Sequence, residues 1–227
     1  MSMPFYVSPE QMMKDKADYA RKGIARGRSL VGLVYADGVL LAAENPSRTL
    51  HKISEIYDRI AFAGVGKFNE FDQLRVAGVR HADVKGFDYS REDVDARSLA
   101  NVYAQFLGQV FTREIKPMEV EILVAEVGPA VGSGEHQLYH IDYSGTIYDQ
   151  DRFAVLGGDA DAIHDRMQAT WADGWALGDA LRAAVAALSG PERALHAEDL
   201  EVAVLERPRE RRAFRRVVDG ELAGLLG

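Results

Sequence analysis

The stretch SPEQMMKDKADYARKGIARGRSLVGLVYADGVLLAAE, residues 8–44, predicts a helix that leads directly into a buried β-hairpin. Its first four residues, SPEQ, have the spacing of a helix-capping box with proline at the first helical position, and we expect this helix over residues 8–26. Two apolar runs then flank Asp37-Gly38, a dipeptide typical of a tight hairpin turn. Neither run alternates with polar residues, which predicts that both faces of these strands are covered by other layers.

Outward from this stretch, hairpins alternate with pairs of helices. Apolar periodicity predicts a hairpin over 52–63, helices over 67–79 and from 90, strands over 120–127, 137–141, 146–148 and 153–156, helices over 160–171 and 175–188, and strands over 200–205 and 214–218. This order is typical of an α+β protein in which two sheets face each other between helix pairs. No repeat or linker divides the chain, so we expect one domain over 8–227, with 216–227 as a C-terminal tail and 1–7 as a flexible arm.

The composition excludes several classes of protein. The 227 residues include no cysteine, which excludes disulfides, cysteine nucleophiles, thiolate zinc sites and iron–sulfur clusters. Acidic residues outnumber basic ones by 35 to 27, and the net charge of -8 argues against nucleic acid as a partner. No apolar run approaches the ~18 residues that span a membrane, and the first residues lack the pattern of a signal peptide. We therefore expect a soluble, cytoplasmic protein with no membrane partner.

The motifs that could carry chemistry are weak. Residues 61–68 contain a Gly-Lys pair but lack the first glycine and the final Ser or Thr of a phosphate-binding loop, and the glycines of 128–134 lack that spacing as well. His136 and His140 could face one side of a strand, yet the six histidines show no tight ligand pattern, so neither a metal nor a cofactor is expected. Six arginines within 206–216 fit a solvated hairpin turn or a subunit contact better than a nucleic-acid site.

Catalysis by an N-terminal nucleophile is the enzymatic chemistry that stays open. The sequence does not exclude a Ser/His/Asp triad, but it contains no Gly-x-Ser-x-Gly elbow. In an N-terminal nucleophile, a terminal Thr, Ser or Cys uses its own α-amine as the base, and a nearby Lys and Asp tune the site.

Two segments carry a resemblance to a known family. Residues 8–44, including Tyr19-Ala20-Arg21, and LHKISEIYDRIAFAGVGKFNEF, residues 50–71, resemble proteasome α-type subunits of the actinobacterial kind, in the N-terminal-nucleophile (Ntn) hydrolase-like superfamily. The likeness extends over nearly the whole chain and implies a four-layer α-β-β-α sandwich, in agreement with the layering expected above. It also implies a non-catalytic subunit of the core particle that forms a seven-membered outer ring, pairs with a β-type catalytic subunit, docks a hexameric AAA ATPase activator and admits unfolded, tagged proteins.

The resemblance implies that this chain has no catalytic residue. Arg28 stands where the catalytic β-type subunits carry their processed threonine, and Glu44 stands where they carry an aspartate. Arginine has no hydroxyl to act as nucleophile. Thr146 follows a glycine, but cleavage there would cut a predicted hairpin in two. A self-processing Ntn hydrolase and an unrelated α+β binding domain are the alternative functions.

The resemblance further implies a docking pocket for an activator. Lys52 matches the family's pocket lysine, whose ammonium pairs with the C-terminal carboxylate of an activator tail, a charge-assisted contact that suits a compact cation. Gly66 matches the pocket wall, where the absence of a side chain lets a tail approach. Without the resemblance, Lys52 reads as a solvated strand residue.

By the same resemblance, the arm corresponds to the family's gate, which closes the axial pore of the ring. The gate residues are Met1, Ser2, Met3, Pro4, Phe5, Tyr6 and Val7. Copies of Phe5 and Tyr6 that converge near the axis could pack together and offset part of the entropy lost on ordering. The alternative is a simply disordered terminus.

Overall fold

The computed structural model describes residues 8–129, 135–207 and 212–227. In chain order, the first part contains α1 (Pro9–Ile24), β1 (Leu30–Tyr35), β2 (Gly38–Glu44), β3 (Ile53–Tyr57), β4 (Ile60–Gly66), α2 (Phe68–Asp88), the 3-10 helix η1 (Arg91–Asp93) and α3 (Ala96–Arg113). The second part contains β5 (Val120–Glu126), β6 (Gln137–Ile141), β7 (Ile147–Gln150), β8 (Phe153–Leu156), α4 (Ala160–Thr170), α5 (Leu177–Ser189), η2 (Ala197–Asp199), β9 (Leu200–Glu206), β10 (Phe214–Arg216) and α6 (Asp219–Leu226).

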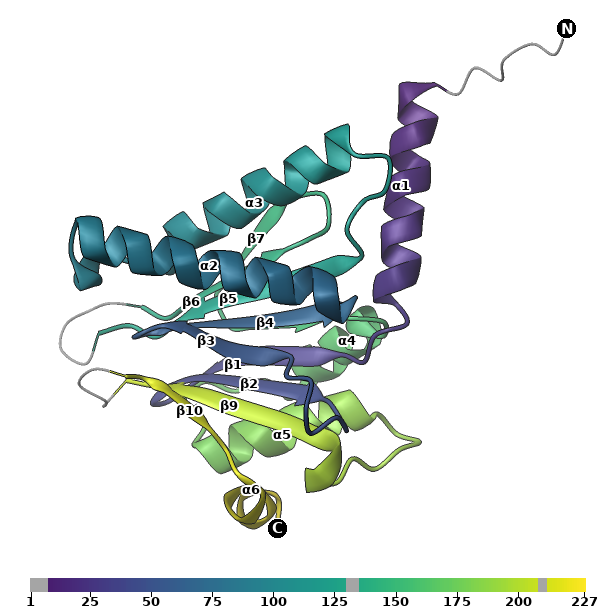
Figure 1. Cartoon of the computed structure of the whole chain (residues 1–227). Helices are drawn as coiled ribbons and strands as arrows, with labels where there is room; N and C mark the ends of the chain where they lie inside the picture. Colours follow the sequence, from purple (N-terminus) through teal and green to yellow (C-terminus); the bar gives the residue numbers. More distant parts are fainter. Residues whose placement is uncertain (1–7, 130–134, 208–211) are drawn as a thin grey trace, which may run out of the picture.

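The strands form two five-stranded sheets that lie face to face between two helix layers (Figure 1). Sheet A has the order β10-β9-β2-β1-β8, and sheet B has the order β3-β4-β5-β6-β7. Helices α2 and α3 cover the outer face of sheet B, whereas α4 and α5 cover the outer face of sheet A. The predicted four-layer α-β-β-α sandwich is therefore confirmed.

The doubly apolar strands have the cover that their composition requires. In the first hairpin, Leu33 pairs with Leu40 and both contact the core beneath α5. Leu30 and Leu41 point the other way, into the core between the sheets, where they share a cluster with Leu123 of β5. Because side chains alternate along a strand, each strand of this hairpin supplies both cores.

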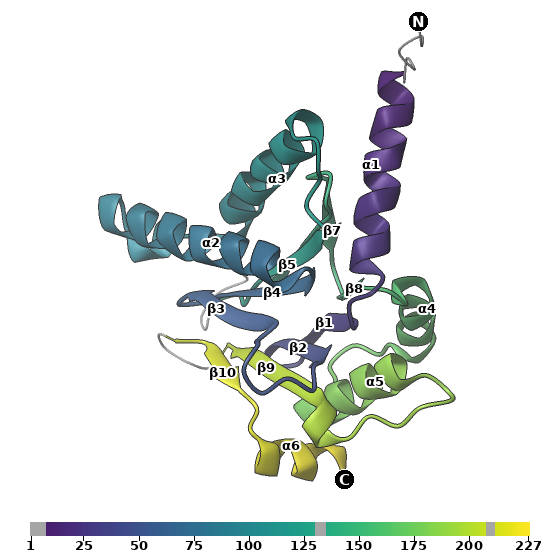
Figure 2. The ribbon, with the colours of Figure 1, turned by 45° about the vertical axis from the view of Figure 1, so that its right-hand side comes forward.

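Helix α1 stands beside the sandwich, and its N-terminal end points away from the sheets (Figure 2). The Ser8 side chain accepts a hydrogen bond from the Gln11 N–H at 3.2 Å, which caps the helix, whereas the Gln11 side chain donates to Asp15 at 2.7 Å, so only half of the predicted capping box forms. Lys16 is buried, and its ammonium donates to the carbonyls of Phe111 at 3.0 Å and Glu114 at 2.6 Å. These carbonyls lie at the C-terminal end of α3, where a cation is favourable, so Lys16 fastens α1 to the body.

Three helices differ from the sequence-based expectation. Helix α3 begins at Ala96 and not at residue 90, because Ser90 caps the short helix η1 and Asp95 caps α3. Helix α2 continues to Asp88 because its inner face uses the small residues Gly78 and Ala82, which do not read as an apolar stripe. A methyl group at Gly78 would lie 1.7 Å from the Tyr103 hydroxyl, so the small residue lets α2 and α3 approach closely. The predicted tail contains the helix α6, of which Leu222 is buried against the core beneath sheet A.

Candidate functional site

Lys52 lies immediately before β3, and its ammonium points toward the segment that enters β1. The Nζ atom donates a hydrogen bond to the Arg28 carbonyl at 2.6 Å. Burial lowers the pKa of Lys52 to about 8, against the opposing effect of the Glu44 and Glu201 carboxylates. In the part of the chain that the structure describes, Nζ has this one hydrogen-bond acceptor, whereas an ammonium has three N–H groups. Lys52 therefore retains donors for an external acceptor.

Glu44, at the end of β2, is the buried carboxylate of the same site. Its side chain accepts from an Arg28 guanidinium N–H, and Arg193 binds both of its oxygens at 3.1 Å each. Arg193 also donates to the Leu188 carbonyl at the end of α5, which fixes its orientation. Arg28 and Arg193 thus both pair with Glu44, so little of its charge is left to neutralise the nearby Lys52 ammonium.

The site offers no hydroxyl in the place of a nucleophile. Arg28, which the resemblance aligns with the nucleophile, has no hydroxyl, and Thr146 lies in the turn between β6 and β7, at the opposite edge of sheet B from β3. The Thr146 N–H donates to the Asp142 side chain at 3.1 Å, and its carbonyl accepts from the Asp142 N–H at 3.1 Å. Thr146 is therefore bound within a closed turn, remote from the lysine that would have to tune it.

Gly66 ends β4 close to this cluster. The strands β3 and β4 are neighbours, and the Gly64 N–H donates to the Lys52 carbonyl at 3.0 Å. Gly66 lies two residues further along β4, where it pairs with Val120 of β5. Its φ of 103° is a conformation that favours glycine, and a methyl group there would lie 2.0 Å from the Glu119 carbonyl oxygen. The path of the chain thus requires a glycine here, independently of any pocket that it lines.

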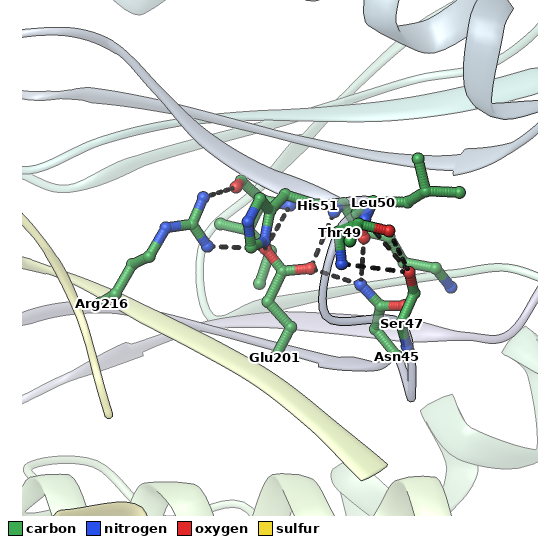
Figure 3. Close-up of polar contacts among 9 residues, drawn as sticks. Asn45, Ser47, Thr49, Leu50, His51, Glu201 and Arg216 are labelled. Carbon is green, nitrogen blue, oxygen red and sulfur yellow. Dashed lines mark hydrogen bonds and ion pairs between the residues drawn. The ribbon is translucent and has the colours of Figure 1, made fainter. Parts of the chain in front are cut away.

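A second buried carboxylate, Glu201 of β9, organises the segment that leads into Lys52 (Figure 3). One oxygen accepts from the Lys52 N–H and the Asn45 amide, each at 2.8 Å. The other accepts from the Ile53 N–H at 3.2 Å and the Arg216 guanidinium at 2.7 Å. Sequence analysis missed Glu201 and Arg193. Glu201 could have been found as a lone glutamate at the start of an apolar strand, because a buried carboxylate is stable only when cations or hydrogen-bond donors pair with it.

The remaining predicted positions lie elsewhere. His136 accepts from the Gly128 N–H at 3.2 Å and lies 2.9 Å from Arg207, and burial together with Arg207 lowers its pKa to about 4. His140 faces Glu121 at 3.6 Å instead, so the two histidines do not converge on one ion. Within the described ranges, no three His, Cys, Asp or Glu side chains form a group that could hold a metal.

The gate residues, 1–7, lie outside the described residues. The turn of the arginine-rich segment falls partly outside them as well, although β9 and β10 pair as an antiparallel hairpin on either side of it. Across residues 8–129, 135–207 and 212–227, no helix has the length and apolar character needed to cross a membrane.

Comparison with known proteins places the whole chain in one group. A family model described as "Proteasome subunit" matches residues 24–205. A protein named "Proteasome subunit alpha" from Acidimicrobium ferrooxidans is 63% identical over 227 residues, which cover 100% of this chain and 97% of the relative. Proteins of the same name from Sanguibacter keddieii and Kineococcus radiotolerans are 58% and 57% identical, and each covers 100% of this chain, with 90% and 98% of the relatives matched.

Proposed function

The chain belongs to the proteasome subunit family as a non-catalytic α subunit of the core particle, and on this premise we propose that it docks an ATPase activator and gates substrate entry. As an α subunit it assembles into rings together with β-type subunits, which carry the threonine protease sites. The docking site is the Lys52 pocket, the gate is formed by residues 1–7, and the assembly is a seven-membered outer ring in the cytoplasm. The activator is a hexameric AAA ATPase that delivers unfolded, tagged proteins.

The observation that carries the docking site is the state of the Lys52 ammonium. It is partly desolvated, it has one acceptor among the described residues, and the nearby Glu44 carboxylate is already paired with Arg28 and Arg193. An incoming carboxylate would replace lost hydration with charge-assisted hydrogen bonds, which are about twice as strong as neutral ones. The C-terminal carboxylate of an activator tail is a ligand of this kind. Gly66 also leaves the end of β4 without a side chain, although the backbone conformation alone already requires a glycine there.

The gate follows from the position of α1. The helix begins at a capped Ser8, and its N-terminal end projects away from the sandwich (Figure 2). In a ring, identical segments that start from identical helices would meet over the axis. Entry of a substrate then depends on whether these segments are drawn aside.

Replacement of Lys52 by methionine tests the docking site, because it removes the charge and keeps the aliphatic stem. The variant chain is assembled with the β-type subunit, and hydrolysis of an unfolded protein is measured with the hexameric ATPase. We expect normal particle assembly and loss of ATPase-stimulated hydrolysis. The matched control is Lys85→Met, a lysine of α2 whose ammonium is bound by Asp95 at 2.8 Å. Undiminished stimulation in Lys52→Met contradicts the proposed pocket.

A further inference from the structure

The segment between β2 and β3 crosses from one sheet to the other, and Glu201 is attached to it. This segment, residues 45–52, leaves sheet A at Glu44 and enters sheet B at Ile53. Glu201 lies in sheet A, where it pairs with Ala43 of β2, yet its carboxylate bonds to residues at the start of sheet B. The carboxylate is therefore a bridge between the two sheets at the point where the chain passes between them.

The bridge holds the backbone of Lys52 directly. The N–H groups of Lys52 and Ile53 have the Glu201 carboxylate as their acceptor, at 2.8 and 3.2 Å. Arg216 completes the arrangement, because one of its nitrogens bonds Glu201 and the other bonds the Ile53 carbonyl at 2.7 Å. The side chains of Glu201 in β9 and Arg216 in β10 therefore bind the backbone at the entry to β3.

The other end of the segment is tied to the same carboxylate. The Asn45 amide bonds Glu201 at 2.8 Å and the Leu50 carbonyl at 2.7 Å, which closes the loop (Figure 3). Ser47 adds a second closure, because its hydroxyl accepts from the Leu50 N–H at 3.1 Å. The loop is therefore anchored at both ends, and the Lys52 side chain starts from a fixed point.

We propose that Glu201 is a positioning residue that fixes Lys52 at the docking site and balances its charge from the opposite sheet. The inference rests on the proposed function of Lys52 for its biological meaning, but the contacts themselves do not. The charged groups around the ammonium are Glu44 and Glu201, which favour it, and Arg28, which opposes it. Arg193 is held by Glu44, while Arg216 and His51 share the Glu201 carboxylate.

Titration of Lys52 by trace acetylation tests the inference without an activator. The assembled particle is treated with acetic anhydride between pH 6.5 and 10, and the acetylated fraction of Lys52 is read by peptide mass spectrometry. We expect a midpoint near pH 8 in the unmodified chain. In Glu201→Gln the midpoint falls by about half a unit or more, because a negative charge that favours the ammonium is lost. An unchanged midpoint overturns the proposal.

Glu126→Gln is the matched control. Glu126 is as buried as Glu201, at 8% exposure each, and it likewise accepts from a backbone N–H, that of Ala96 at 2.8 Å, and from an arginine. It lies at the far end of β5 from this site, so its loss should leave the Lys52 midpoint in place. An equal shift in both variants means a general loosening of the fold and also overturns the proposal.

A second variant keeps the proposal testable if Glu201→Gln fails to fold. Asn45→Ala removes one attachment of the loop and leaves every charge near Lys52 in place. We expect it to weaken ATPase-stimulated hydrolysis with little change in the acetylation midpoint. If the midpoint shifts in Glu201→Gln but Lys52→Met leaves ATPase-stimulated hydrolysis intact, the charge balance between Glu201 and Lys52 holds and the proposed docking function fails. If Asn45→Ala leaves docking intact while Lys52→Met abolishes it, anchoring of the loop is refuted.

Discussion

The Lys52 ammonium lies 2.6 Å from the Arg28 carbonyl oxygen, so the lysine side chain is bonded to the backbone just before β1. In an N-terminal nucleophile enzyme a lysine tunes the attacking group. Here the same kind of side chain has a carbonyl as its partner and keeps donors for a ligand. The N–H groups of the Lys52 ammonium that have no acceptor among the described residues therefore suit the binding of an anion.

Docking of the activator should weaken as the pH rises. Lys52 has a pKa of about 8 in the folded chain, below its ordinary value of 10.5, because burial disfavours the charge. The ammonium is present below this pKa and is lost as the pH rises through it. We expect docking affinity to be constant from pH 6.5 to 7.5 and to fall by about tenfold per unit above pH 8. The measurement is ATPase binding to the assembled particle by light scattering across this range.

Lys52→Arg provides the control for this pH dependence. A guanidinium stays charged throughout the range, so any docking that the variant retains should be independent of pH. A parallel decline in both proteins would assign the pH dependence to another group.

Removal of the Tyr103 hydroxyl should stabilise the fold. This oxygen is buried and has no hydrogen-bond partner among the described residues, and it faces Gly78 across the contact between α2 and α3. A buried polar group without a partner is destabilising, so Tyr103→Phe should raise the free energy of unfolding by about 1 kcal/mol. Urea denaturation gives this value from a shift in the midpoint at constant slope.

Gly78→Ala should have the opposite effect. Its methyl group would overlap the Tyr103 hydroxyl, and overpacking of this kind is destabilising by about 1–3 kcal/mol. In the Tyr103→Phe background the loss should be smaller because the closest atom is gone. Additive effects of the two changes would show that the residues do not interact as the structure places them.

His136 should make the fold sensitive to mild acid. Its pKa is lowered to about 4 in the folded chain, against 6.5 as its ordinary value, because burial and Arg207 disfavour the charged ring. Between these two values the unfolded chain binds the extra proton, so stability falls as the pH drops from 6.5 toward 4. The loss should be about 1 kcal/mol once solvent screening is allowed for. Urea midpoints of the chain and of His136→Asn should converge at pH 7 and diverge at pH 4.5, and parallel curves would contradict the assignment.

The layers of the fold can be predicted from short stretches, whereas the site cannot. The Asp37-Gly38 turn and its doubly apolar strands indicate covered sheets within a few residues of sequence. Glu201 bonds Lys52 across 149 positions of the chain, and no local pattern contains that contact. The length of α2 was underestimated for a related reason, since Gly78 is inward-facing only because Tyr103 of another helix lies against it.

Deletion of residues 1–7 should open the assembled particle to small peptides. The deletion leaves Ser8 in place, and this residue caps α1 through the Gln11 N–H at 3.2 Å, so the helix should keep its position. With the arm removed, nothing in the proposed gate obstructs the axis, and hydrolysis of a short fluorogenic peptide should rise several-fold. Ser8→Ala is the control, because it retains the arm and loosens the cap by about 1 kcal/mol. A gate that acts by steric closure predicts a large rise in the deletion and a small one in Ser8→Ala. Equal rates in the deleted and full-length particles would show that the arm does not limit entry.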